Sequence, residues 1–204
     1  MSSDRRREAI LEAVSRQVVD SEMTMTTKEL AQAAGVAEGT LFRVFDSKEE
    51  LLIAAFSHRL EQMARNDDAD GRLAALHELP SLRERLDVYI ALATDLISSW
   101  VHMMVIFRRF LRGSEGQRAK GAVEAHKSEI TRVKNTYQER LSYLTRCCHD
   151  LIGPDADQLR MPVDTVVAFV QSVVMSMAMA REFHDFGITA DDASSIVMDG
   201  VLRH

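Results

Sequence analysis

The segment from Thr26 to Lys48 carries polar side chains on what reads as a pair of short helices. The two helices are joined through Gly35 and Val36, and small and apolar residues supply their inner face. This is the pattern of a helix-turn-helix, whose second helix enters the DNA major groove. Each base pair presents a distinct set of hydrogen-bond donors and acceptors in that groove. The chemistry predicted for this segment is therefore recognition of DNA.

Two other clusters contain side chains that are able to bind a metal ion. The acidic run Asp67-Asp68-Ala69-Asp70 reads either as a metal site or as a solvated helix end, and the absence of a second matching cluster favours the latter. Cys147-Cys148-His149-Asp150 invites a metal or redox interpretation, but adjacent residues of one helix do not converge on a single ion. We therefore expect no metal site and no cofactor.

Catalytic patterns are missing from the sequence as well. We find no paired nucleophile and base, no glycine-rich phosphate loop and no zinc-ligand spacing. The sequence therefore predicts a protein that is not an enzyme.

Composition and charge limit the fold and the compartment. The 204 residues include 9 Gly and 3 Pro, which is little turn material and favours helices over a many-stranded sheet. A formal charge of −6 excludes a uniformly basic coat for nucleic acid. No apolar run follows the N-terminal arginines, and the longest uncharged stretch, between Asp164 and Arg181, has 16 residues. A membrane-spanning helix needs about 20 residues, so we expect a cytoplasmic chain without membrane contact.

Hydrophobic periodicity predicts an all-α fold of about nine helices. Two start signals have the capping-box form, Thr26 with Glu29 and Ser47 with Glu50, and Thr189 is a further candidate cap. Ser98 and Ser99 suggest a break in the middle of an otherwise long helix. The expected helices lie near 5–18, 26–34, 38–45, 47–63, 82–97, 100–111, 118–151, 162–184 and 190–202.

The run TTKELAQAAGVAEGTLFRVFDSK at 26–48, with a helix before it and Leu52 and Phe56 after it, resembles the N-terminal domain of TetR-family transcriptional regulators. The match covers about 35 residues; the rest of the chain resembles the family only in length and helix count. The resemblance implies a three-helix DNA-binding domain over 1–66, whose last helix (48–65) leads into a ligand-binding and dimerisation bundle over 67–204.

The resemblance also implies roles for particular residues toward DNA. Hydroxyls, cations and helix starts bind phosphate, and helix side chains read base edges. The implied phosphate contacts are Thr26, Thr27, Lys28 and Lys48, and the residues implied on the recognition helix are Glu38, Gly39, Thr40, Phe42 and Arg43. Arg5, Arg6 and Arg7 are candidates for an arm that reaches the DNA backbone or minor groove.

Three positions depart from the family pattern. Phe42 stands where the family usually has Tyr, Val44 where it often has His, and Ala37 where it often has Ser. The missing polar groups concern the anchoring to phosphate rather than the fold.

The second half of the chain supplies candidates for an effector pocket and a dimer interface. Aromatic and methionine side chains favour a hydrophobic small molecule. Pocket candidates are Trp100, Met103, Met104, Phe107, Phe110, Tyr137, Leu141 and Phe169. The helix at 162–184 is apolar on all sides, so we expect its own domain to cover one face and a partner copy the other. Interface candidates are Val166, Val170, Val173, Val174, Met177, Ile196, Val197 and Val201.

These observations together predict a ligand-responsive regulator that binds double-stranded DNA as a homodimer. The family's usual logic implies a repressor that a small hydrophobic effector releases from a nearly palindromic operator. The alternative is a helical small-molecule sensor without sequence-specific DNA binding. Residues 1–66 hold nine Lys and Arg against 11 Asp and Glu, so the cations must cluster on one face, and we expect weak non-specific binding.

Overall fold

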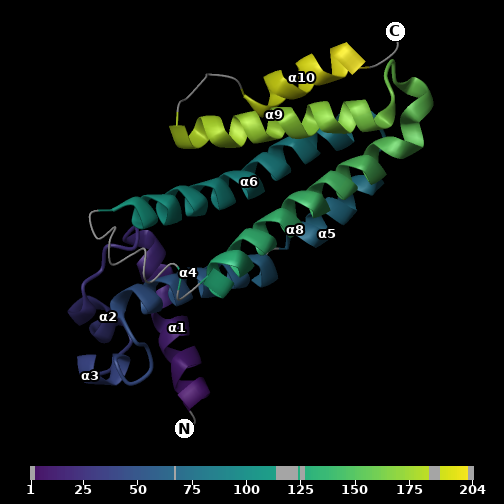
Figure 1. The fold of residues 1–204 in the computed structure, drawn as a ribbon. Helices are drawn as coiled ribbons and strands as arrows, with labels where there is room; N and C mark the ends of the chain where they lie inside the picture. The colour runs from purple at the N-terminus through teal and green to yellow at the C-terminus, as the bar shows by residue number, and fades with distance from the viewer. Residues whose placement is uncertain (1–2, 67, 114–123, 125–126, 184–188, 202–204) are drawn as a thin grey trace. The chain divides into compact units, whose positions relative to one another are not determined.

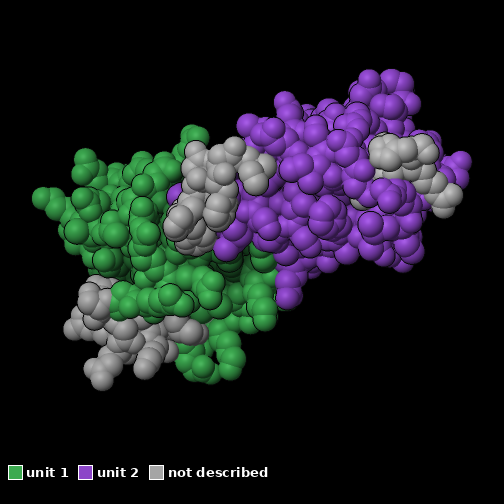
Figure 2. All heavy atoms as spheres, turned by 90° about the horizontal axis from the view of Figure 1, so that it is seen from above, with its two compact units in different colours: residues 1–66, 103–137 green, residues 67–102, 138–204 purple. Residues whose placement is uncertain are grey.

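The computed structural model describes residues 3–66, 68–113, 124, 127–183 and 189–201, and most of these residues are in helices, with no strand among them (Figure 1). The predicted all-α fold is therefore confirmed. The chain divides into two compact units, residues 1–66 with 103–137, and residues 67–102 with 138–204 (Figure 2). The predicted boundary at 66/67 coincides with a change of unit, but unit 1 also takes 103–137. The functional division into domains stays a prediction.

Unit 1 is built around the contact between α1 (Ser3–Asp20) and α4 (Lys48–Asn66). The buried side chains of α1 recur at helical spacing, as in Ile10, Val14 and Val18. In α4 the whole run 51–58 is buried, so this helix is the centre of the unit. Along the chain, α1 is followed by the two short helices α2 (Thr27–Ala33) and α3 (Glu38–Leu41), which contact each other, and then by α4.

The third helix is shorter than predicted. The sequence predicts a helix over 38–45, whereas α3 ends at Leu41 and the chain continues in turns. Helical hydrogen bonding persists in part, because the backbone N–H of Phe45 donates to the carbonyl of Leu41 at 2.9 Å. The segment thus keeps its side chains on two faces although only its first turn is a regular helix.

Two long helices contribute residues to both units. Helix α6 (Leu82–Arg112) and helix α8 (Lys127–Ile152) each cross from one unit to the other along the chain. The predicted break at Ser98 and Ser99 is wrong, because α6 is continuous there. Both hydroxyls donate to carbonyls one turn earlier, Ser98 to Thr94 at 2.7 Å and Ser99 to Asp95 at 3.1 Å. Such bonding lets serine remain inside a helix.

Unit 2 contains the smaller elements of the second half. Helix α5 (Ala69–Ala75) and the 3₁₀ helix η1 (Leu76–Glu78) lie in a stretch for which the sequence predicts no helix. A second 3₁₀ helix, η2 (Gly153–Gln158), follows the end of α8 at the predicted stop. Helices α9 (Val163–Phe183) and α10 (Ala190–Val201) lie along each other (Figure 1).

A buried tyrosine joins three helices of unit 2. The hydroxyl of Tyr89 on α6 donates to the carbonyl of Leu144 on α8 at 2.8 Å. It also accepts from the Gln171 side chain on α9 at 2.6 Å. Because Tyr89 is fully buried, burial raises its pKa far above the ordinary value of 10.0. The hydroxyl therefore stays protonated and acts as a fixed connection between the three helices.

Helix α9 buries one face and exposes the other. Val166, Val170 and Val174 are fully buried in unit 2, whereas Phe169 and Met179 are 48% and 41% exposed. By length and composition alone, α6 and the Val163–Arg181 part of α9 are apolar enough to span a membrane, and helices in protein cores pass the same test. The most apolar stretch of α6 is 56% buried inside the structure, and that of α9 is 28% buried.

Four helices begin with the same kind of N-terminal cap. A Ser or Thr hydroxyl accepts a hydrogen bond from the backbone N–H three residues later, at 3.0 to 3.3 Å. The four pairs are Thr26 with Glu29, Ser47 with Glu50, Ser81 with Glu84, and Thr189 with Asp192. This arrangement satisfies N–H groups that have no partner within the helix. The predictions for Thr26 and Thr189 are confirmed. At Ser47 the hydroxyl cap is present, but the Glu50 carboxylate accepts from the backbone N–H of Asp46 and does not close the predicted box. The start at Ser81 was not predicted.

Candidate nucleic-acid interface

The start of α2 is held by a complete capping box. The Glu29 carboxylate accepts from the backbone N–H and the hydroxyl of Thr26, both at 2.7 Å. These bonds lower the pKa of Glu29, first through the backbone and then through the hydroxyl, and the charge of Lys48 lowers it further. The Thr26 hydroxyl is thus engaged within the chain, and its role toward phosphate stays a prediction.

The turn between α2 and α3 requires glycine. Gly35 has φ of +65°, a left-handed conformation that other residues adopt only with strain. The backbone N–H of the next residue, Val36, donates to the carbonyl of Ala31 at 3.0 Å and closes the turn. The predicted helix stop at Gly35 is therefore confirmed, and this turn sets the direction in which α3 leaves α2.

The residues of α3 and its C-terminal turn separate into an inner and an outer face. Leu41 and Phe45 are buried in unit 1, as the sequence predicted. Phe42 is 49% exposed, and Arg43 is also exposed. Glu38 and Gly39 are exposed and Thr40 is half-buried, so each predicted reading residue reaches the outer face at least in part. The structure thus offers to a partner the side chains that the sequence assigned to base contact.

Contacts within the chain do not explain why residue 39 is a glycine. A Cβ atom added there would meet no atom within 4 Å, and its φ is not positive. Glycine disfavours a helix, so its presence in α3 costs stability without relieving a clash. A surface that approaches this backbone from outside the chain would explain the residue.

Two cations stand at helix starts near the same edge. Lys28 is exposed in the first turn of α2, and Lys48 is the half-buried first residue of α4. The effect of Lys48 on the pKa of Glu29 shows that the starts of α2 and α4 lie within electrostatic reach of each other. The structure therefore brings the predicted phosphate contacts at 26–28 together with Lys48. Thr27 is half-buried beside them.

The N-terminal arginines do not form an extended arm. Helix α1 already begins at Ser3, so Arg5, Arg6 and Arg7 are helical. Arg7 points into unit 1, where it forms an ion pair with Glu50 at 2.8 Å. Its guanidinium carbon also lies 4.4 Å from the centre of the Phe45 ring. Local sequence patterns do not reveal this role, because Arg7 and Glu50 are 43 positions apart.

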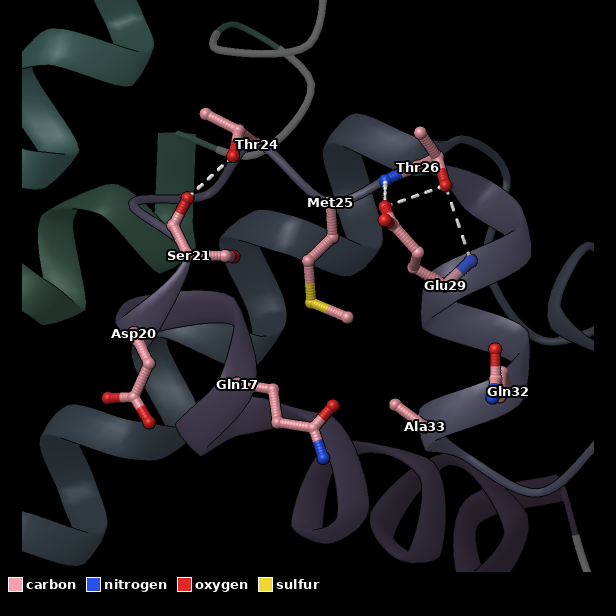
Figure 3. Close-up of a pocket in the computed structure, with 9 residues that line it drawn as sticks. All are labelled: Gln17, Asp20, Ser21, Thr24, Met25, Thr26, Glu29, Gln32 and Ala33. Carbon is pink, nitrogen blue, oxygen red and sulfur yellow. Dashed lines mark hydrogen bonds between the residues drawn. The ribbon is translucent and has the colours of Figure 1, made fainter.

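An open hollow of about 900 Å³ lies between the end of α1 and α2 (Figure 3). Its lining is mostly polar, so it differs from the apolar effector pocket that the sequence predicted. Figure 3 shows Met25 among the side chains that line it, with the capping box beside it. The lining residues are Gln17, Asp20, Ser21, Thr24, Met25, Thr26, Glu29, Gln32 and Ala33.

The predicted effector-pocket residues fall in both units. Met103, Met104, Phe107, Phe110 and Tyr137 belong to unit 1, and Trp100, Leu141 and Phe169 belong to unit 2. Phe107 stacks on Phe56 of α4 with ring centres 4.6 Å apart, so it is part of the core. Phe169 lies on the exposed face of α9 and not in a cavity. The pocket as a whole stays a prediction.

The residues predicted for the dimer interface need a correction. Val166, Val170, Val174 and Val197 are fully buried within unit 2, so they are not open to a partner. The error is one of helix phase, because an all-apolar helix does not show which face turns inward. Ile196 is 65% exposed, Val173 and Met177 are half-buried, and the side chain of Val201 lies outside the described part.

The cysteine pair is shielded in part from solvent, and both thiols have raised pKa values. Cys148 is buried, and burial raises the pKa of its thiol to about 12. Cys147 is half-buried and its pKa is also raised, mainly by burial. Among the residues that the structure describes, no group of three or more His, Cys, Asp or Glu side chains is arranged to hold a metal ion. Asp67, of the acidic run, lies outside those residues.

Comparison with known families identifies the segment that carries these features. Residues 23–55 match the family model described as bacterial regulatory proteins, tetR family. The matched segment includes α2, α3 and the first turns of α4. It therefore contains the predicted DNA contacts between Thr26 and Lys48, and the candidate arginines 5–7 lie outside it.

Solved structures match along nearly the whole chain. A protein described as a TetR-family transcriptional regulator from Mesorhizobium loti has a TM-score of 0.55 and 15% identity, with 100% of both chains covered. A regulator from Saccharomonospora viridis in complex with choline has a TM-score of 0.54 and 17% identity, over 98% of this chain and 100% of that one. The transcriptional regulator FadR from Bacillus subtilis in complex with stearoyl-CoA has a TM-score of 0.51 and 16% identity, over 95% and 98%. Residues 23–55 therefore carry the sequence of the tetR family of bacterial regulatory proteins, and the chain has the all-α fold of TetR-family transcriptional regulators.

Proposed function

We propose that this protein regulates transcription by binding a specific DNA sequence through α2 and α3. The observation that carries the proposal is the two-faced character of 38–45, within the family match. Leu41 and Phe45 anchor the segment in the core, while Phe42 and Arg43 remain exposed beside the open backbone of Gly39. A helix presented in this way suits the major groove.

Each exposed side chain has a distinct proposed task. Arg43 pairs with a guanine edge, Thr40 contacts a base edge or a thymine methyl, and Glu38 accepts from cytosine. Lys28 and Lys48 bind backbone phosphates at two helix starts and so fix the register of the protein on DNA. Phe42 contributes only apolar contact, which leaves one phosphate bond fewer than a tyrosine would make.

The proposed assembly is a homodimer that reads a nearly palindromic operator. Its support is the exposed apolar face of unit 2, on which Phe169, Met179 and Ile196 are all more than 40% exposed. Exposed apolar groups of this kind mark interaction sites. Light scattering at micromolar concentration is expected to show a dimer, and Ile196→Glu to shift it toward monomer. A wild-type protein that stays monomeric contradicts this part of the proposal.

The proposed effector is a small hydrophobic molecule whose binding releases the DNA. Two structures of the same fold contain ligands, stearoyl-CoA in FadR from Bacillus subtilis and choline in the regulator from Saccharomonospora viridis. Trp100 is the sole tryptophan of the chain and a pocket candidate, so its emission reports binding directly. We expect stearoyl-CoA to change the emission and to weaken operator binding, and choline to do neither. Failure of stearoyl-CoA in both assays contradicts a hydrophobic long-chain effector.

The proposed function is tested by selecting bound DNA from a random pool. The selected sequence is then compared with random DNA in an anisotropy titration at several salt concentrations. A regulator shows preference for the selected sequence and loses affinity as salt rises. Lys48→Ala is expected to weaken binding to both DNAs about equally, with a salt slope lower by about one. A pool that yields no preferred sequence refutes the proposal and favours a sensor without specific DNA binding.

A further inference from the structure

A charged cluster connects residues 38–45, called here the recognition segment, with α1, α4 and α8. Its centre is Arg7 of α1, whose guanidinium forms ion pairs with Glu50 of α4 at 2.8 Å and with Glu129 of α8 at 3.5 Å. The same guanidinium lies over the buried ring of Phe45, 4.4 Å from its centre. All four residues belong to unit 1. One side chain thus contacts three other elements of the DNA-binding unit.

Glu50 bonds both to Arg7 and to the backbone of the chain between α3 and α4. One of its oxygens accepts from Arg7, and the other accepts from the backbone N–H of Asp46 at 2.5 Å. Its own backbone N–H donates to Ser47 at 3.0 Å. Glu50 is only 9% exposed, so its carboxylate depends on these partners for the stabilisation that water would otherwise give. The path of residues 45–47 is therefore held by a carboxylate that Arg7 neutralises.

Glu129 brings a second helix into the same cluster. It lies in the first turn of α8, close to the buried Val133. Helix α8 is continuous from Lys127 to Ile152, and its residues beyond 137 belong to unit 2. Because a helix is stiff along its axis, a shift or rotation of α8 moves Glu129 with it. Such a movement changes how Arg7 divides its donors between two carboxylates.

We infer that Arg7 is a positioning residue for the recognition segment, and that Glu129 makes its position depend on α8. The inference rests on the proposed function and adds a route by which unit 2 affects DNA reading. Arginine suits this role because its planar fork bonds two carboxylates while its face lies on an aromatic ring. Arg7 acts through Glu50 and Phe45 and makes no contact with DNA.

The experiment compares Arg7→Ala, Arg7→Lys and Glu129→Gln in the full-length protein. Arg132→Ala is the matched control, because Arg132 also joins α8 to α4, but through an ion pair with Glu61 at 3.1 Å and not through Glu50. The first measurement is the ratio of affinities for the selected operator and for random DNA. This ratio cancels the general effect of a changed net charge. The second is the slope of affinity with salt, and the third is amide hydrogen exchange at Asp46.

The inference predicts a defined pattern among these variants. Arg7→Ala lowers the affinity ratio about tenfold, an effect of the size found for residues that couple distant sites. The salt slope stays unchanged, because no phosphate contact is lost. Exchange at Asp46 accelerates. Arg7→Lys lowers the affinity ratio less than Arg7→Ala does, and Glu129→Gln lowers it about threefold. A double variant with Arg7→Ala and Glu129→Gln has the same ratio as Arg7→Ala alone. Arg132→Ala matches the wild type.

Other outcomes overturn the inference. A salt slope reduced by about one, with equal weakening on all DNA, makes Arg7 a direct phosphate contact. Full recovery by Arg7→Lys shows that a single charge suffices, and an unaffected ratio in Glu129→Gln removes the link to α8. Should Arg7→Ala not fold, Arg7→Lys and Glu129→Gln still decide the question. A wild-type protein that selects no DNA refutes the proposed function before the variants are compared.

Discussion

The substitution Gly39→Ala separates the demands of folding from those of DNA binding. An added Cβ at this exposed position of α3 meets no atom of the chain within 4 Å. Alanine restricts the unfolded chain and favours a helix, which stabilises a protein by roughly 0.4–1 kcal/mol where the backbone is compatible. We therefore expect the free energy of unfolding to rise by about that amount, with a melting temperature higher by about 1–4 °C.

DNA binding is expected to change in the opposite direction. If the backbone at Gly39 lies against DNA, the methyl group occupies space that the complex needs. Overpacking a close contact costs roughly 1–3 kcal/mol, which corresponds to binding that is weaker by about fivefold to about 160-fold. The assay is an anisotropy titration with the selected operator, combined with thermal denaturation of the same preparation. The predicted result is a more stable protein that binds its operator less tightly.

Gly200 supplies the matched control. It is an exposed glycine in the last turn of α10, and an added Cβ there also meets no atom within 4 Å. Because Gly200 follows Ile196 by one turn, operator affinity is measured at a concentration where light scattering shows the same assembly for both proteins. Under that condition Gly200→Ala is expected to stabilise the protein by a similar amount and to leave operator affinity as it is. If Gly39→Ala binds the operator as tightly as the wild type, DNA does not approach this backbone closely, and our reason for the glycine is wrong.

Four further changes test other parts of the structure. Phe42→Tyr adds a hydroxyl on an exposed ring and should strengthen binding to all DNA about tenfold, since a hydrogen bond to a charged group contributes roughly 1.5 kcal/mol; unchanged affinity in titrations contradicts this. Arg43→Ala should cost roughly 1–3 kcal/mol and relax one operator position, as a repeated selection would show. Tyr89→Phe removes the bonds to Leu144 and Gln171 and should lower the free energy of unfolding by about 1–3 kcal/mol in urea. The Cys148 thiol, with its pKa raised to about 12, stays protonated in the fold while the unfolded chain ionises near 9.0, so stability should fall as the pH rises from 9 toward 12; a flat profile between pH 8 and pH 11 contradicts it.

Local signals in the sequence predicted local structure well. The box at Thr26, the hydroxyl cap at Ser47 and the turn at Gly35 depend only on residues within four positions, and all three are present. The second half of the box predicted at Ser47 differs, because the Glu50 carboxylate accepts from Asp46 instead. The separation of Leu41 and Phe45 from Phe42 and Arg43 follows from helical periodicity alone. These features define most of the candidate site.

Features that depend on distant residues were not predictable in this way. Arg7 reads as a free terminal cation until Glu50 and Glu129, 43 and 122 positions away, are placed beside it. Helix α9 is apolar all round, so its sequence does not show that Val170 turns inward and Phe169 outward. Ser98 is a residue type that often ends a helix, yet its hydroxyl donates to the carbonyl of Thr94 and α6 continues. For Arg7 and α9 the deciding contacts are with other helices. For Ser98 the deciding contact is a hydrogen bond to a carbonyl of the same helix.

The hydroxyl cap that recurs at four helix starts has a consequence for how the chain folds. Nucleating a helix is its slowest and least favourable step, because several residues are fixed for one hydrogen bond. In α2, α4, α6 and α10 the residues that help this step lie within a single turn of each other. Helix formation can therefore begin at several points before any tertiary contact exists, which is a property of rapidly folding, locally connected proteins.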